Sequence, residues 1–146
     1  MLRISKLTDY AIVLATRMAE LEGPMSCRAL AERSGLPKPT VAKVLKCLGR
    51  AGIVDATRGV CGGYALARTP ETISVGEIIA AIDGPIAVTE CTDDRPDTGC
   101  AHETDCELRA NWQRINDALG AALEGISLAE MGAANVGGAL IQLRRG

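Results

Sequence analysis

The fold is decided by residues 26–68, which read SCRALAERSGLPKPTVAKVLKCLGRAGIVDATRGVCGGYALAR. In the first part, apolar residues recur every three or four positions, which predicts a short helix over residues 27–33 and a second over residues 38–50. In the second part, short apolar segments over residues 53–58 and 63–67 flank a glycine-rich stretch, which predicts a β-hairpin. Two helices joined by a tight turn and followed by a hairpin are typical of a winged helix-turn-helix.

Helices are also predicted on both sides of this stretch. Before it, residues 8–21 place apolar side chains on one face of a helix, with Thr8 as the expected N-cap. After it, residues 74–83 begin with Ser74 and a glutamate three positions on, the spacing of a capping box. The expected fold is therefore mainly α with a small β-hairpin wing, and residues 1–86 form the winged helix-turn-helix domain.

The last third of the chain predicts a long helix with one apolar stripe. The stripe alternates spacings of four and three residues, which suits pairing with a second copy better than packing within a small chain. We therefore expect a homodimer, with a cysteine-bearing loop over residues 87–104, a dimerisation helix over 105–131 and a mobile tail over 132–146. The stripe consists of Leu108, Trp112, Ile115, Leu119, Ala122 and Ile126.

Charge divides the chain into two unlike halves. Residues 1–70 hold 11 Lys and Arg against 5 Asp and Glu, whereas residues 71–146 hold 5 against 13, so the net charge of −2 conceals a basic N-terminal half. A basic surface attracts the phosphates of DNA. Charge alone fits two solvated surfaces of opposite sign equally well, but the order of helices and hairpin favours double-stranded DNA as the partner.

The residues expected to contact DNA lie on the two central helices and the hairpin. The second helix of a helix-turn-helix enters the major groove, where Thr40 can reach base edges and lysines hold phosphates. Arg58, in the hairpin, is placed to enter the minor groove or to contact the backbone. The full set is Arg28, Lys38, Thr40, Lys43, Lys46 and Arg58.

Three cysteines, Cys91, Cys100 and Cys106, occupy the acidic loop before the long helix. The chain has no run of about 18 apolar residues and no secretory signal at its start, so we expect a cytoplasmic protein with no membrane partner and with reduced thiols. Three thiolates supply all but one ligand of a four-ligand site for iron–sulfur or zinc. Their spacing matches neither a zinc ribbon nor a ferredoxin, so the residues alone leave a cluster, zinc and a thiol switch open.

The quoted stretch resembles the winged-helix segment of the bacterial IscR and NsrR family of iron–sulfur regulators. The matching elements are Leu30-Ala31, Val44-Leu45 and the hairpin run from Arg58-Gly59 to Gly62-Gly63-Tyr64. The opening MLRISKLTDYA and the later segments GPIAVTEC and RANWQRINDAL resemble the branch associated with the SUF iron–sulfur assembly system. The resemblance covers residues 1 to about 131.

This resemblance implies a homodimer that binds an inverted-repeat operator. It also implies an iron–sulfur cluster, [4Fe–4S] or [2Fe–2S], on Cys91, Cys100 and Cys106. The function implied is a transcriptional regulator, and we expect a repressor of iron–sulfur assembly or iron-responsive genes. The alternative is a winged-helix regulator without a cluster, which works through a thiol switch or through zinc.

The resemblance leaves two candidates for the fourth ligand. Some relatives place a histidine three residues after the third cysteine, where this chain has Arg109, which cannot ligate a metal. Another relative supplies an aspartate from the start of the first helix of the partner subunit, and the matching residue is Asp9. The single histidine, His102, is the second candidate. With one histidine and no glycine-rich phosphate loop, the chain is not expected to be an enzyme.

Overall fold

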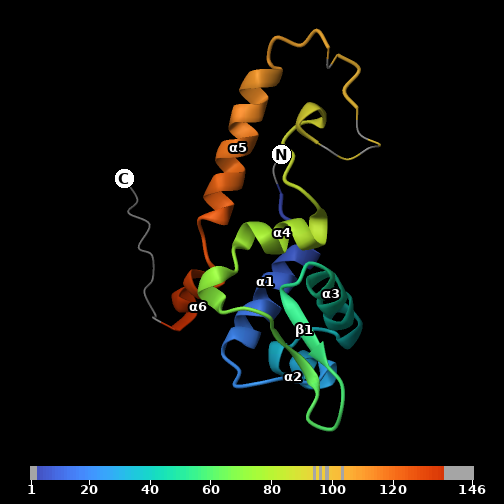
Figure 1. The fold of residues 1–146 in the computed structure, drawn as a ribbon, viewed down its shortest axis with the longest axis vertical. Helices are drawn as coiled ribbons and strands as arrows, with labels where there is room; N and C mark the ends of the chain where they lie inside the picture. Colours follow the sequence, from blue (N-terminus) through green and yellow to red (C-terminus); the bar gives the residue numbers. More distant parts are fainter. Residues whose placement is uncertain (1–2, 94, 96, 98, 103, 137–146) are drawn as a thin grey trace.

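The computed structural model of the chain describes residues 3–93, 95, 97, 99–102 and 104–136. Figure 1 shows most elements gathered in one body, from which the helix α5 extends away. None of the helices in these described ranges is long and apolar enough to cross a membrane. The elements in order are α1 (Lys6–Ala19), α2 (Cys27–Ser34), α3 (Lys38–Arg50), β1 (Val54–Thr57), β2 (Gly63–Leu66), the 3-10 turn η1 (Pro70–Thr72), α4 (Val75–Asp83), the 3-10 turn η2 (Glu90–Thr92), α5 (Arg109–Glu124) and α6 (Leu128–Val136).

The core is aliphatic and lies around α1, which contacts α2, α3, α4 and α6. The chain contains no Phe, so Leu, Ile, Val and Ala must fill the interior. Leu14 of α1, Val44 and Leu48 of α3 and Ile78 of α4 are all fully buried. The predicted mainly helical fold with one two-stranded hairpin is confirmed, and the predicted apolar face of α3 is the face that packs into the core.

The prediction that Thr8 caps the first helix is wrong. The cap is Ser5, whose Oγ accepts a hydrogen bond from the Thr8 amide at 3.1 Å, so α1 begins two residues earlier than expected. Thr8 is instead fully buried, and its hydroxyl donates to Asp83 Oδ2 at 2.8 Å. Thr8 therefore links the start of α1 to the end of α4.

The predicted capping box at the start of α4 is confirmed. Ser74 Oγ accepts from the Glu77 amide at 3.0 Å, and the Glu77 carboxylate accepts from the Ser74 amide at 2.9 Å. Arg68, just after the hairpin, donates to Glu77 Oε1 at 2.6 Å. Burial raises the pKa of Glu77, but the hydrogen bonds from Ser74 and the charge of Arg68 outweigh burial and leave the pKa below its ordinary value.

The predicted helix over residues 105–131 is two helices. α5 ends at Glu124, and α6 begins at Leu128, where Ser127 Oγ accepts from the Glu130 amide at 3.2 Å and the Glu130 carboxylate accepts from the Ser127 amide at 2.7 Å. This second capping box ends the apolar stripe and turns the chain back onto the body, where Leu128 is fully buried. The predicted tail begins inside α6, and its residues 137–146 lie outside the described residues.

Two backbone hydrogen bonds fix the base of α5 on the body. The Val75 amide donates to the Ile126 carbonyl at 2.9 Å, and the Leu128 amide donates to the Ile73 carbonyl at 2.7 Å. We call this antiparallel pairing the 73–75/126–128 bridge. Beside it, a Cβ on Gly76 would lie 3.0 Å from Glu124 Cγ and 3.2 Å from its backbone nitrogen, so a larger residue would have to displace Glu124 at this close approach of α4 and α5.

Candidate nucleic-acid interface and cysteine loop

The helix-turn-helix forms where the sequence predicts it. Ser26 Oγ caps α2 by accepting from the Ala29 amide at 3.2 Å, and Gly35 ends it in the left-handed conformation with φ of 70°. Pro37 then precedes the first turn of α3, where a proline interrupts no helical hydrogen bond. Because one face of α3 is buried in the core, its opposite face is presented to solvent.

The candidate DNA contacts on α2 and α3 lie at the surface. Lys38, Lys43 and Lys46 are exposed along α3, and Thr40 is half-buried at its start. Arg28 is exposed on α2, where its Nε lies 3.1 Å from Glu32 Oε1. A pair this exposed contributes little to stability and can be exchanged for a phosphate. The structure therefore exposes these cations on two helices that contact each other.

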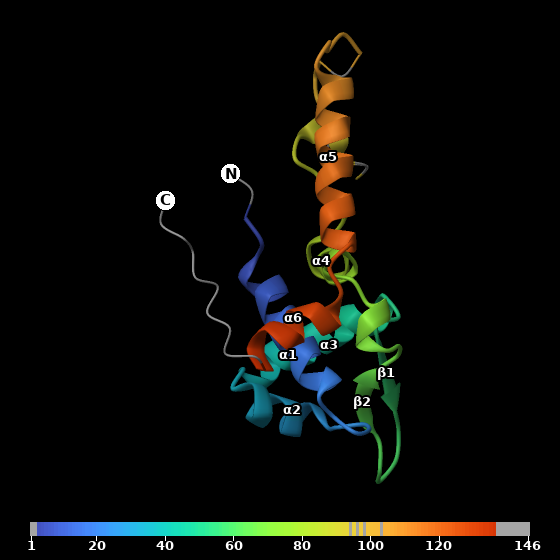
Figure 2. The same ribbon diagram turned by 90° about the vertical axis from the view of Figure 1, so that its left-hand side faces the viewer.

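The hairpin is anchored to the segment before α2. Its strands pair in register from Val54 opposite Leu66 to Thr57 opposite Gly63. Met25 and Tyr64 exchange two backbone hydrogen bonds, at 3.0 and 2.8 Å, which add a short third segment to the pairing. Arg58 is exposed directly after β1, on a hairpin that projects from the end of the body opposite the free end of α5 (Figure 2).

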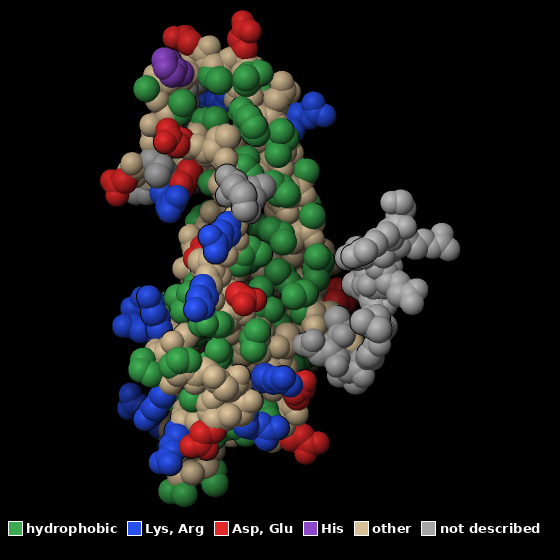
Figure 3. Space-filling model, turned by 180° about the vertical axis from the view of Figure 1, so that it is seen from behind, with side chains coloured by type: hydrophobic (Ala, Val, Ile, Leu, Met, Phe, Trp, Pro, Cys, Tyr) green, Lys and Arg blue, Asp and Glu red, His purple; other side chains and the backbone are tan. Residues whose placement is uncertain are grey.

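The apolar stripe of α5 lies at the surface. No residue of this helix is buried, and Leu108, Trp112 and Ile115 are 57%, 38% and 46% exposed. Figure 3 shows the apolar side chains as a continuous stripe along this part of the molecule. A continuous apolar patch on a protein surface is more often a site of interaction with a partner than a surface that stays exposed to water.

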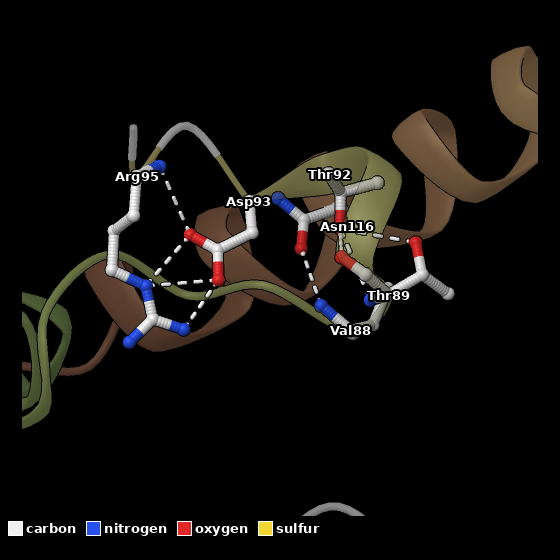
Figure 4. Close-up of polar contacts among 6 residues, drawn as sticks. All are labelled: Val88, Thr89, Thr92, Asp93, Arg95 and Asn116. Carbon is white, nitrogen blue, oxygen red and sulfur yellow. Dashed lines mark hydrogen bonds and ion pairs between the residues drawn. The ribbon is translucent and has the colours of Figure 1, made fainter. Parts of the chain in front are cut away.

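Cys91 lies in η2, and this end of the cysteine loop is tied to α5 (Figure 4). The Val88 amide donates to Asn116 Oδ1 of α5 at 3.1 Å. Thr92 is buried, and its hydroxyl donates to the Thr89 carbonyl at 2.9 Å. The Thr89 hydroxyl lies 3.1 Å from Cys91 Sγ. The sequence did not predict the role of Asn116, because its bond to the Val88 amide joins residues 28 positions apart and leaves no local pattern. The role of Thr89 was also missed, although its contacts with Cys91 and Thr92 are local.

A second polar contact folds the acidic loop onto itself. Arg95 Nε donates to the two carboxylate oxygens of Asp93 at 2.8 and 2.9 Å (Figure 4). The hydrogen bonds and the negative charge of Asp93 raise the pKa of the Arg95 guanidinium above its ordinary value.

The other candidate ligands lie in different places. Cys100 and Cys106 are half-buried, His102 is exposed, and the Cys106 carbonyl accepts from the Arg109 amide at the start of α5. Among the residues that the structure describes, no three Cys, His, Asp or Glu side chains are grouped to hold a metal ion. The donor set of three thiols has the chemistry of a soft-metal site, but the single chain does not bring the three together.

Asp9 lies beside the last residues of α5. It is exposed on α1 and lines a groove of about 610 Å³ with Leu123, Ile126 and Met131. Because α5 has 16 residues, its ends are about 24 Å apart, and Cys106 lies just before its first residue. Within one chain, therefore, Asp9 is separated from Cys106 by about the length of α5.

The chain as a whole is similar to bacterial transcriptional regulators. Residues 4–134 match the Rrf2 family model, described as an iron-dependent transcriptional regulator. The HTH-type transcriptional repressor NsrR of Streptomyces coelicolor is 31% identical over 145 residues, which cover 97% of this chain and 96% of that protein. The HTH-type transcriptional regulator IscR of Aliivibrio salmonicida is 31% identical over 131 residues, with 86% and 76% covered. The solved structure of CymR, the global cysteine regulator of B. subtilis, has a TM-score of 0.69 and 29% identity over 92% of this chain and 98% of that one.

The tether between the cysteine loop and α5 makes a first prediction. Asn116→Ala removes the acceptor of the Val88 amide, and one such hydrogen bond is worth about 1 kcal/mol, or about fivefold in the population of the detached loop. We expect Cys91 to be alkylated by N-ethylmaleimide about fivefold faster in this variant, as measured by mass spectrometry of the cysteine peptides. Asn111→Ala, at an exposed position of the same helix, should leave the rate unchanged. Equal rates in both variants would show that the tether does not hold Cys91.

Proposed function

Since the chain belongs to the Rrf2 family, whose members are DNA-binding transcriptional regulators and not enzymes, we propose that it is a homodimeric repressor of iron–sulfur assembly or iron-responsive genes. The single observation that carries this proposal is the family match over residues 4–134, which includes the helix-turn-helix, the wing and the cysteine loop. One relative is named a transcriptional repressor, which supports repression rather than activation as the proposed role. As a regulator that acts on DNA, the protein is proposed to work in the cytoplasm.

In the proposed complex, α3 enters the major groove of an inverted-repeat operator. Thr40 contacts base edges near the start of the helix, and Lys38, Lys43 and Lys46 hold phosphates along it. Arg58 enters the adjacent minor groove, and Arg28 exchanges Glu32 for a phosphate. The exposure of all four cations on α2 and α3 supports these roles.

The second copy is proposed to cover the stripe of α5. A helix with no buried residue and three large apolar side chains facing water is stabilised when a matching stripe packs against it. Two such stripes would pair around a two-fold axis. This arrangement would place the two winged helix-turn-helix domains side by side, as binding to an inverted-repeat operator requires.

The iron–sulfur cluster is proposed on Cys91, Cys100 and Cys106, with Asp9 of the partner subunit as the fourth ligand and His102 as the alternative. The length of α5 separates Asp9 from Cys106 of the same chain, which supports the partner's Asp9 as the ligand. A bound [4Fe–4S] or [2Fe–2S] cluster would supply a group that responds to oxygen, nitric oxide or iron supply. The residues of this chain would hold it through three thiolates and orient the first of them through Thr89 and Asn116.

A cluster-free regulator is the second candidate. One observation favours it: the described residues do not group three ligands for a metal ion. In that case the same thiols would respond to oxidation or bind zinc, and the DNA-binding surface would be unchanged.

DNA binding is tested by removing charges from α3 and the wing. Lys43→Ala and Arg58→Ala should each weaken binding to an operator selected from random DNA, and each should lower the slope of log affinity against log salt by about 1, because one phosphate contact is lost. Fluorescence anisotropy over a range of salt concentrations measures both effects. Arg114→Ala removes the same charge from an exposed position of α5, which extends away from α3 and the wing, and should leave the slope as it was. If the double variant binds like the wild type, the assignment of these contacts is wrong.

The dimer is tested by placing a charge in the stripe. Ile115→Asp should convert the dimer to a monomer in sedimentation equilibrium, because an unpaired carboxylate would be buried between two copies of α5. Ala110→Asp adds the same charge at an exposed position of α5 outside the stripe and should leave the dimer intact. A dimer that survives Ile115→Asp would place the interface elsewhere.

The cofactor is tested by purifying the protein without oxygen. The wild type should contain iron and sulfide and absorb visible light. The triple variant Cys91→Ala, Cys100→Ala, Cys106→Ala should lose the iron, the sulfide and the visible absorption. The variant Cys61→Ala, at the exposed wing, should retain all three. Zinc without iron would favour the second candidate, and a colourless, iron-free protein after reconstitution would contradict the cluster.

A further inference from the structure

The tip of the hairpin presents an apolar side chain entirely to solvent. Val60 has a relative exposure of 106%, the highest of the large exposed apolar residues in the described chain, and the next residue, Cys61, is exposed as well. Val60 is absent from the core cluster and from the apolar side chains packed against it. A single exposed apolar side chain is common on protein surfaces, so its meaning depends on how and where it is held.

The backbone of the tip is closed tightly on both sides of Val60. Gly59 has φ of 116°, a conformation that side chains rarely allow, and its carbonyl accepts from the Gly62 amide at 3.1 Å. A Cβ on Gly62 would lie 2.2 Å from the Thr57 carbonyl oxygen, so only glycine fits there. The turn therefore has a defined shape with Val60 and Cys61 at its apex.

The end of β2 next to the tip is also held in place. Met25 and Tyr64 pair through two backbone hydrogen bonds, and a Cβ on Gly63 would lie 2.6 Å from the Met25 carbonyl group. The wing is thus attached to the segment that leads into α2. A projection held in this way loses little conformational entropy when it enters a groove, which favours binding.

The tip also lies next to the cation assigned to the minor groove. Arg58 precedes Val60 by two residues and is exposed, and the hairpin projects beyond the helical body at the end opposite the free end of α5 (Figures 1 and 2). If Arg58 reaches the minor groove, the apex of the turn must meet the same groove. An apolar side chain there cannot make hydrogen bonds with base edges, but it can be buried between two of them.

We propose that Val60 is a wedge that enters the minor groove of the operator, partly unstacks one base step and bends the DNA toward the major groove. This inference rests on the proposed DNA binding. Apolar wedges of this kind bend DNA by about 20–90°. The cost of unstacking is lowest at pyrimidine–purine steps such as TA, so Val60 gives the operator a preference for such a step under the wing without any hydrogen bond to a base.

The test compares two variants of Val60 on operators that differ in one step. Val60→Ser removes the apolar side chain, and Val60→Ile keeps an apolar side chain, larger by one methylene group, at the same exposed position. Energy transfer between dyes at the two ends of the DNA measures the bend, and anisotropy measures affinity for operators with TA or AA under the wing. The wild type and Val60→Ile should bend the DNA and prefer TA. Val60→Ser should bend it less, lose this preference and bind the TA operator about tenfold more weakly.

The salt dependence separates this inference from the function on which it rests. Val60→Ser removes no charge, so its salt slope should equal that of the wild type, whereas Arg58→Ala should lower the slope. Normal binding by Val60→Ser with an unchanged bend and an unchanged step preference would overturn the wedge alone. A wild type that binds none of the DNA tested would overturn the proposed DNA contacts and the wedge together.

Discussion

The 73–75/126–128 bridge is the interaction on which the arrangement of the molecule depends. No side chain of α5 is fully buried, although Leu123 packs against the core, and a helix of its length is marginal in water without tertiary contacts. The bridge joins it to the body through Ile73 and Leu128, which are fully buried on either side of the pairing. The same few residues therefore complete the core and set the direction of α5. The position of the cysteine loop follows, because Asn116 ties that loop to α5.

The sequence predicted the elements whose signals are local. The periodic apolar positions of α3 and the spacing of Ser74 and Glu77 lie within one or two helical turns, and the structure confirms both. Thr8 was misassigned because Ser5 and Thr8 are equally good caps, and the buried bond from Thr8 to Asp83 crosses 75 positions of sequence. The predicted helix extended beyond the end of α5 because Ile126 keeps the spacing of the apolar stripe. Its end depends on the bridge, which joins distant segments.

The candidate site was predictable to different degrees. The cations of α3 lie at the surface as expected, because burying one face of a helix exposes the other. The three cysteines were grouped by their closeness in sequence, but a polar loop has no apolar core to draw them together within one chain. The proposed cluster would be coupled to α3 through α5, the bridge and α4, which contacts α3. A coupling of about 1–3 kcal/mol along this route would change operator affinity about 5–150-fold.

The separation of charge along the molecule has a kinetic consequence. Among the described residues, the excess of Lys and Arg in residues 3–70 lies in the body and wing, while the excess of Asp and Glu after residue 70 extends to the far end of α5, so this part of the chain is an electric dipole. In the field of a DNA duplex such a dipole experiences a torque that turns its positive pole toward the phosphates. In a two-fold dimer, the components along the axis add. Molecules would then meet DNA already oriented, and fewer encounters would be lost to collisions with the wrong face.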